Sequence, residues 1–106
     1  MNNDKKNNIT ISDTVFSKMI GQIIIDNKML FIDKNYLKQK QDKKALKIDV
    51  DNNEKAIKVT LDLNANYSNN ISNTAAKLQT EIKTVIENMT GYAVKEININ
   101  IVKVIK

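Results

Sequence analysis

The strongest constraint on the fold is a pair of alternating stretches on either side of a short polar turn. In "ALKIDV" and in "KAIKVTLDLNANY", apolar residues occupy every second position and polar residues lie between them. The turn that separates the two stretches reads "DNNE". Period-2 alternation on both sides of an Asp/Asn cluster predicts a β-hairpin. Because only one side of each strand is apolar, we expect the sheet to bury one face and to expose the other.

Two further stretches carry apolar residues at helical spacing. The first helix is predicted over residues 12–26, with Ser12 as its N-cap. Its apolar face comprises Val15, Phe16, Met19, Ile20, Ile23 and Ile24. The second helix is predicted to begin around Ser72, and its apolar stripe comprises Ile71, Ala75, Leu78, Ile82, Val85, Ile86 and Met89. Thr90 and Gly91 end this helix, and we expect Gly91 to adopt the left-handed conformation that favours glycine.

These elements predict a small α+β domain with the order β-α-β-β-α-β. Residues 9–11 ("ITI") are the predicted first strand, and the stretch that begins near residue 93 is the last. We expect a mixed four-stranded sheet with both amphipathic helices on one face. At 106 residues the chain is long enough for one domain. We assign residues 9–106 to it, expect residues 1–8 to be a disordered polar N-terminus, and interpret residues 28–44 as a basic connector that starts strand-like.

The composition excludes several kinds of chemistry. The chain has no Cys and no His, which removes metal sites and catalytic groups built on those residues. Its two glycines stand alone, so no phosphate-binding loop is present. Asp49, Asp51 and Glu54 gather around the predicted turn, where carboxylates are usually just solvated. We therefore expect no enzyme, no cofactor and no small-molecule substrate. The polar start "MNNDKKNN" and the lack of a long apolar run predict a cytoplasmic protein.

The whole net charge of +5 comes from one stretch, residues 34–47, because the rest of the chain is neutral. Its lysines are Lys34, Lys38, Lys40, Lys43, Lys44 and Lys47. They can form a solvated connector, a patch for an anionic membrane surface, or a site of non-specific attraction to phosphate. The third possibility makes a nucleic-acid-binding module the alternative function. Nucleic acid is the less favoured partner, because the chain lacks arginine, a GXXG loop and aromatics on its predicted strands.

The last strand loses its alternation near its end. Ile97, Ile99 and Ile101 share one face, but Val102 and Val104 fall on the opposite, asparagine-bearing face if the strand stays regular. Either a bulge re-phases the strand after Ile101, or its end presents apolar surface to another chain. Val102 and Val104 are therefore candidate interaction residues, together with the lysines above.

The runs "ITISDTVFSKMI" and "NISNTAAKLQTEIKTVIENMTGYAVKEININIVKV" resemble the alkaline shock protein family of envelope-stress proteins. The positions that carry the resemblance are Ala75 or Ala76, Leu78, Gln79, Ile82, Ile86, Glu87, Met89, Thr90, Gly91, Val94, Ile97, Asn98, Ile99 and Ile101. The chain departs from the family at "DNKMLF", where Gly-Val is usual, and at Tyr67-Ser68, where Tyr-Gly is frequent.

The resemblance implies a non-enzymatic cytoplasmic protein. Family members associate with the inner face of the membrane, typically through a membrane-anchored protein partner, and support envelope or alkaline-stress tolerance. Others are linked with fatty-acid metabolism genes and look like regulators. The family offers no catalytic or cofactor residues to carry over. We accordingly expect an interaction or scaffold protein with a protein partner, with self-association as one form of that interaction.

Overall fold

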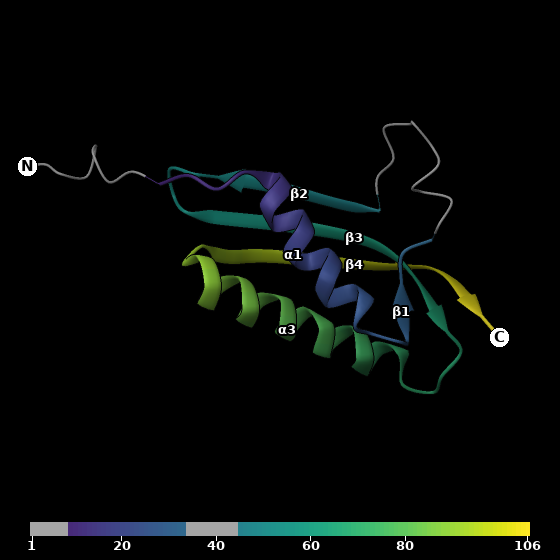
Figure 1. Cartoon of the computed structure of the whole chain (residues 1–106). Helices are drawn as coiled ribbons and strands as arrows, with labels where there is room; N and C mark the ends of the chain where they lie inside the picture. The colour runs from purple at the N-terminus through teal and green to yellow at the C-terminus, as the bar shows by residue number, and fades with distance from the viewer. Residues whose placement is uncertain (1–8, 34–44) are drawn as a thin grey trace, which may run out of the picture.

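A computed structural model of the chain describes residues 9–33 and 45–106. The elements are α1 (Asp13–Ile25), β1 (Leu30–Phe31), β2 (Leu46–Asp51), β3 (Ala56–Asn66), α3 (Ile71–Thr90) and β4 (Ala93–Ile105). Figure 1 shows β2, β3 and β4 lying side by side along the molecule, with α1 crossing in front of them. The expected α+β class is confirmed.

The sheet is built around β3, which has neighbours on both of its edges. β2 pairs with it antiparallel, from Leu46 opposite Leu61 to Asp51 opposite Ala56. The two residues of β1 pair antiparallel with the far end of β3, and β4 pairs with β3 in parallel. The sheet is therefore mixed, as predicted. The parallel pair needs a crossover connection, and α3 supplies it.

The core lies between the inner face of β3 and the two helices. From Ile57 to Ala65 every second residue of β3 is buried, as the alternation predicts, but Asn64, which was expected on the exposed face, is buried as well. The buried residues that face one another are Ile57, Val59, Leu61, Leu63 and Ala65 from β3, Phe16, Ile20, Ile23 and Ile24 from α1, and Leu78, Ile82 and Ile86 from α3. Because both helices bury their apolar stripes against the same strand, they cover the same face of the sheet.

The prediction of a strand at residues 9–11 is wrong. This segment pairs with no strand in the described part of the chain, and the short β1 is the fourth strand. The N–H of Ile11 instead donates to side chains, Oδ1 of Asn52 at 3.3 Å and the hydroxyl of Tyr92 at 3.2 Å. These contacts tie the segment to the hairpin turn and to the start of β4.

Two members of the predicted helical stripes lie outside the core. Val15 is 45% exposed and Met89 is 72% exposed. Each lies in a terminal turn of its helix, where the described residues leave it uncovered. Ser12 occupies the N-cap position of α1 with extended backbone, but within the described residues its side chain makes no capping hydrogen bond.

Truncating the buried stripe should therefore destabilise the fold far more than truncating its exposed end. We expect Ile82→Ala to lower the free energy of unfolding by about 2–5 kcal/mol, because it leaves a cavity in the core. Met89→Ala, on the same helix, should change it by less than about 0.5 kcal/mol. Urea unfolding followed by circular dichroism measures both, and similar losses for the two variants would contradict this account of the core.

Candidate functional site

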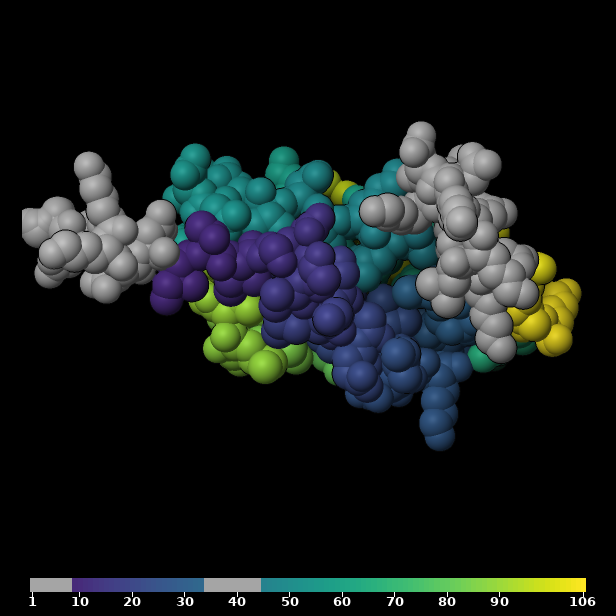
Figure 2. Space-filling model, turned by 45° about the horizontal axis from the view of Figure 1, so that its top comes forward, coloured from purple at the N-terminus to yellow at the C-terminus, as the bar shows by residue number. Residues whose placement is uncertain are grey.

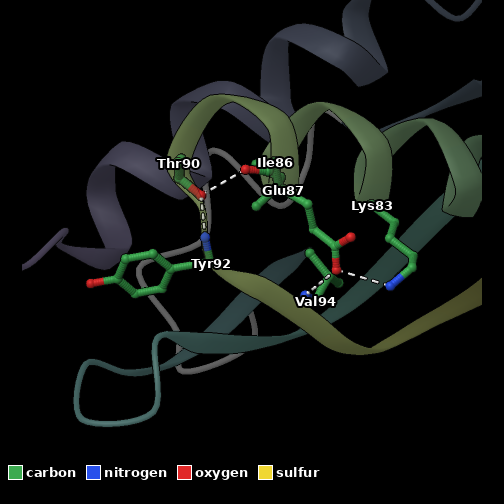
Figure 3. A network of polar contacts seen from close by, with 6 residues as sticks. All are labelled: Lys83, Ile86, Glu87, Thr90, Tyr92 and Val94. Carbon is green, nitrogen blue, oxygen red and sulfur yellow. Dashed lines mark hydrogen bonds and ion pairs between the residues drawn. The ribbon is translucent and has the colours of Figure 1, made fainter.

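The corner between α3 and β4 is fastened by hydrogen bonds from one threonine (Figure 3). Thr90 Oγ1 donates to the carbonyl of Ile86 at 2.6 Å and accepts the N–H of Tyr92 at 3.1 Å. Gly91 follows with φ of +78°, and its N–H donates to the carbonyl of Glu87 at 3.0 Å. The bond from Gly91 occupies one of the carbonyls that the end of a helix otherwise leaves unpaired.

Tyr92 then anchors the corner to the rest of the molecule. Its ring is buried and packs against Phe16 of α1, with the ring centroids 5.2 Å apart. Its hydroxyl donates to Asn52 Oδ1 in the hairpin turn and accepts the N–H of Ile11. A single aromatic side chain thus contacts the turn, the first helix and the segment that precedes it.

Side chains of α3 also bind the backbone of β4. Glu87 Oε2 accepts the N–H of Val94 and the ammonium of Lys83, both at 2.9 Å (Figure 3). Gln79 Nε2 donates to the carbonyl of Ile97 at 2.9 Å. An open strand edge is a template for pairing with another chain, and covering it blocks such pairing. The N–H of Val94 and the carbonyl of Ile97 are therefore occupied by side chains of the same chain.

The hydrogen bond from Lys83 and the N–H of Val94 together hold the pKa of Glu87 below its ordinary value of 4.5. Partial burial of the carboxylate opposes this effect, and the positive charge of Lys83 adds to it. Glu87 therefore stays ionised into the acidic range, where it keeps both of its partners.

The far end of β4 contains the bulge that was one of the two alternatives predicted for the segment after Ile101. Ile101 lies beside Leu63 and Lys103 lies beside Asn64, so Val102 is skipped in the pairing with β3. Val102 and Val104 nevertheless remain 51% and 42% exposed. Of the two readings of this segment, the bulge is present. That the exposed valines meet another chain stays a prediction.

A second bulge, which the sequence analysis missed, lies near the start of β4. Val94 pairs with Ile57 and Glu96 with Lys58, so Lys95 is skipped. The spacing of the apolar residues could have indicated this bulge. Val94 and Ile97 are three residues apart, yet both pack on the core. Residues on one face of a regular strand are separated by an even number.

The outer face of the sheet carries mostly polar residues along β2 and β3 in the described part of the chain. Asp51 Oδ1 accepts the N–H groups of Asn53 and Glu54, which is ordinary turn chemistry. Glu54 itself pairs with Lys95 at 3.1 Å. Within residues 9–33 and 45–106, no three acidic side chains are grouped as a metal ion would require. The carboxylates near the hairpin thus have structural partners or solvent.

Of the six lysines of the basic stretch, the structure describes one. Lys47 is exposed on the outer face of β2, opposite Thr60. Lys34, Lys38, Lys40, Lys43 and Lys44 lie outside the described residues, as do residues 1–8. Neither of the two described helices is long and apolar enough to span a bilayer.

Comparison with protein families decides the affiliation of the chain. A model of the alkaline shock protein 23 family, described as having a cell envelope-related function, matches residues 1–106. The chain belongs to this family. The resemblance is confirmed, and several of the residues that carry it (Gln79, Glu87, Thr90 and Gly91) are those that join α3 to β4. Neither curated proteins nor solved structures give a match.

The contacts of Glu87 predict a pH-dependent contribution to stability. A carboxylate whose pKa is lowered by folding stabilises the fold above its ordinary pKa, and this effect is lost as the pH falls below about 4.5 through the folded value. Glu87→Gln should therefore be less stable than the unaltered protein at neutral pH. The difference should shrink in acid, where Glu87 is protonated. Urea unfolding over a pH series measures it.

The matched control for this experiment is Glu81→Gln, which alters an exposed glutamate on the same helix. Its effect on the free energy of unfolding should vary much less with pH. If the effect of Glu87→Gln is equally flat across the series, the ion pair with Lys83 does not contribute as described.

The two glycines should respond to alanine in opposite directions. At Gly91 the positive φ makes any L side chain strained, so Gly91→Ala should destabilise the fold by about 1–2 kcal/mol. At Gly21 the backbone is helical and no described atom lies within 4 Å of an added Cβ, so Gly21→Ala should stabilise it by about 0.5–1 kcal/mol. Thermal unfolding compares the two, and a shift of the same sign would contradict the assignment.

Proposed function

We propose that this protein is a non-enzymatic interaction protein of the cell envelope, which acts by binding a protein partner near the cytoplasmic face of the membrane. Membership of a family with a cell envelope-related function supports the setting. Asp51 and Glu54 at the hairpin turn are engaged in structural contacts, which supports a binding role over a catalytic one. A membrane-anchored partner fits this role because the described helices offer no span.

The observation that carries the proposal is the exposed apolar end of β4. Val102, Val104 and Ile105 remain accessible there, and Tyr67 lies beside them because its N–H donates to the carbonyl of Ile105 at 2.7 Å. Tyr67 is 62% exposed. Exposed apolar groups that gather at one place on a soluble domain mark an interaction site more often than scattered ones do.

The chemistry of this end suits a partner segment that is both apolar and acidic. Lys103 lies within the exposed segment of β4, and the Lys106 ammonium lies 6.0 Å from the centre of the Tyr67 ring. The interaction therefore combines burial of the valines with attraction by the lysines. We favour this function over nucleic-acid binding, since Lys47 shares the outer face of β2 with Asp49 and Asp51.

Regulation of lipid metabolism is a second form of the same role. In that case the partner is a soluble metabolic enzyme rather than a membrane protein. The two forms share the binding surface and differ in the cell fraction that holds the partner.

The test is capture of partners on the immobilised full chain from separate membrane and soluble fractions. We expect a membrane protein to be retained, and its retention to fall roughly tenfold with Val102→Ser/Val104→Ser, because two exposed valines contribute on the order of 1–2 kcal/mol when buried. Val15→Ser is the control, since Val15 is similarly exposed but lies on α1. Retention of a metabolic enzyme alone favours the regulatory form. No retention, or equal retention by both variants, would overturn the proposal.

A further inference from the structure

Gly21 lies in the middle of α1, where the described residues give no reason for a glycine. Its φ is not positive, so the backbone does not require the residue. No described atom lies within 4 Å of the position that a Cβ would take, so close packing does not require it either. Glycine in a helix interior nevertheless destabilises the helix by about 0.5–1 kcal/mol relative to alanine. What the missing side chain provides is open space at the surface.

That open space belongs to an apolar pocket of about 400 Å³ between α1 and the β1 segment. Its lining residues are Gly21, Ile24, Ile25, Asn27, Phe31 and Ile32. Asn27 is the polar member, and its Oδ1 already accepts the N–H groups of Met29 and Leu30. The pocket therefore suits an apolar group that brings no hydrogen bond of its own.

A protruding apolar side chain stands at the rim of the same pocket. Ile25 lies one helical turn after Gly21 and hence on the same side of α1. It is 74% exposed, which is more than any other large apolar side chain among the described residues. Figure 2 shows the purple-to-blue α1 on the outside of the molecule, where a second chain can reach it. This patch, which consists of the pocket at Gly21 and the side chain of Ile25, thus carries both a hole and a projection that can fill the same hole in another copy.

We propose that a second copy of this chain binds here, with the two α1 helices antiparallel about a two-fold axis and each Ile25 inserted into the pocket of the other copy. A two-fold interface requires one surface that is complementary to itself, and a hole beside a projection meets that requirement. The absent side chain of Gly21 lets the helices approach closely, as small residues do at helix contacts.

The charges around the patch permit this contact despite the net charge of +5. Asp26 and Lys28 lie one and three residues after Ile25 and carry opposite charges, so the contact does not bring two patches of one sign together. The interface is small, and small interfaces form weak, transient complexes. We therefore expect dimerisation in the micromolar range.

This inference rests on the proposed function in treating protein association as the activity of the chain, but it uses α1 and leaves the end of β4 exposed. Its first test is sedimentation velocity of the full chain over a wide concentration range. The unaltered protein should dimerise, while Gly21→Met, which fills the pocket, and Ile25→Ser, which removes the projection, should each weaken dimerisation at least tenfold. Met89→Ser is the matched control, since Met89 is as exposed as Ile25 but lies on α3, and it should leave dimerisation unchanged.

Gly21→Met also separates loss of association from loss of folding. Methionine is a good helix former and the space at Gly21 is open, so the thermal midpoint should stay the same or rise while the dimer is lost. A monomer at every concentration, or an unchanged dimer in Gly21→Met, would overturn the inference.

A second test uses the absence of cysteine from the chain. In the proposed dimer the two Ile25 positions lie near the axis, so Ile25→Cys should form a disulfide between copies when treated with diamide. Met89→Cys should do so much more slowly, and equal rates would count against the interface.

Capture of a partner by a monomeric chain would leave the proposed function standing and reject the dimer. A dimer that captures no partner would support the inference and reject the proposed function.

Discussion

The fold depends on the burial of one face of β3 by both helices. β3 is the strand to which β1, β2 and β4 all pair, and its inner residues form the centre of the core. Most of the stability of a helix in a protein comes from packing its apolar face, so α1 and α3 persist because they bury apolar residues on this strand. Ile82 and Ile86 of α3 and Ile20 of α1 are fully buried there. Displacing either helix would expose the same strand face and weaken the support of the other.

The elements that the sequence predicted well are those whose pattern repeats over several turns or residue pairs. The β2–β3 hairpin and α3 have long periodic stretches, and local periodicity was enough to locate them. β1 has two residues, which is too short to show a period. Residues 9–11 have the composition of a strand, but Ile11 finds hydrogen-bond partners on the hairpin turn and on Tyr92. Strand identity there was decided by contacts distant in the chain.

At the corner between α3 and β4, single residues also differ in whether local sequence could predict them. The left-handed Gly91 follows from the "MTG" helix end, because the conformation is a local requirement. The role of Tyr92 could not be predicted, since its partners Asn52 and Ile11 lie 40 and 81 positions away. The pairing of Glu87 with the N–H of Val94 could not be predicted either, because it depends on how β4 packs beside α3. The pocket at Gly21 likewise forms only when β1 packs beside α1.

The two candidate surfaces have a joint consequence because they lie on different elements. If two copies associate through α1, each dimer presents two exposed β4 ends. A partner confined to a membrane offers many copies of its binding segment on one surface, so the second contact of a dimer becomes effectively intramolecular. Such linkage can raise overall binding by about 10²–10⁴-fold without any new contact, provided the geometry allows both ends to engage. Weak dimerisation through Gly21 and Ile25 would then convert a modest affinity of the β4 end into stable attachment, and it would do so only where the partner is locally concentrated.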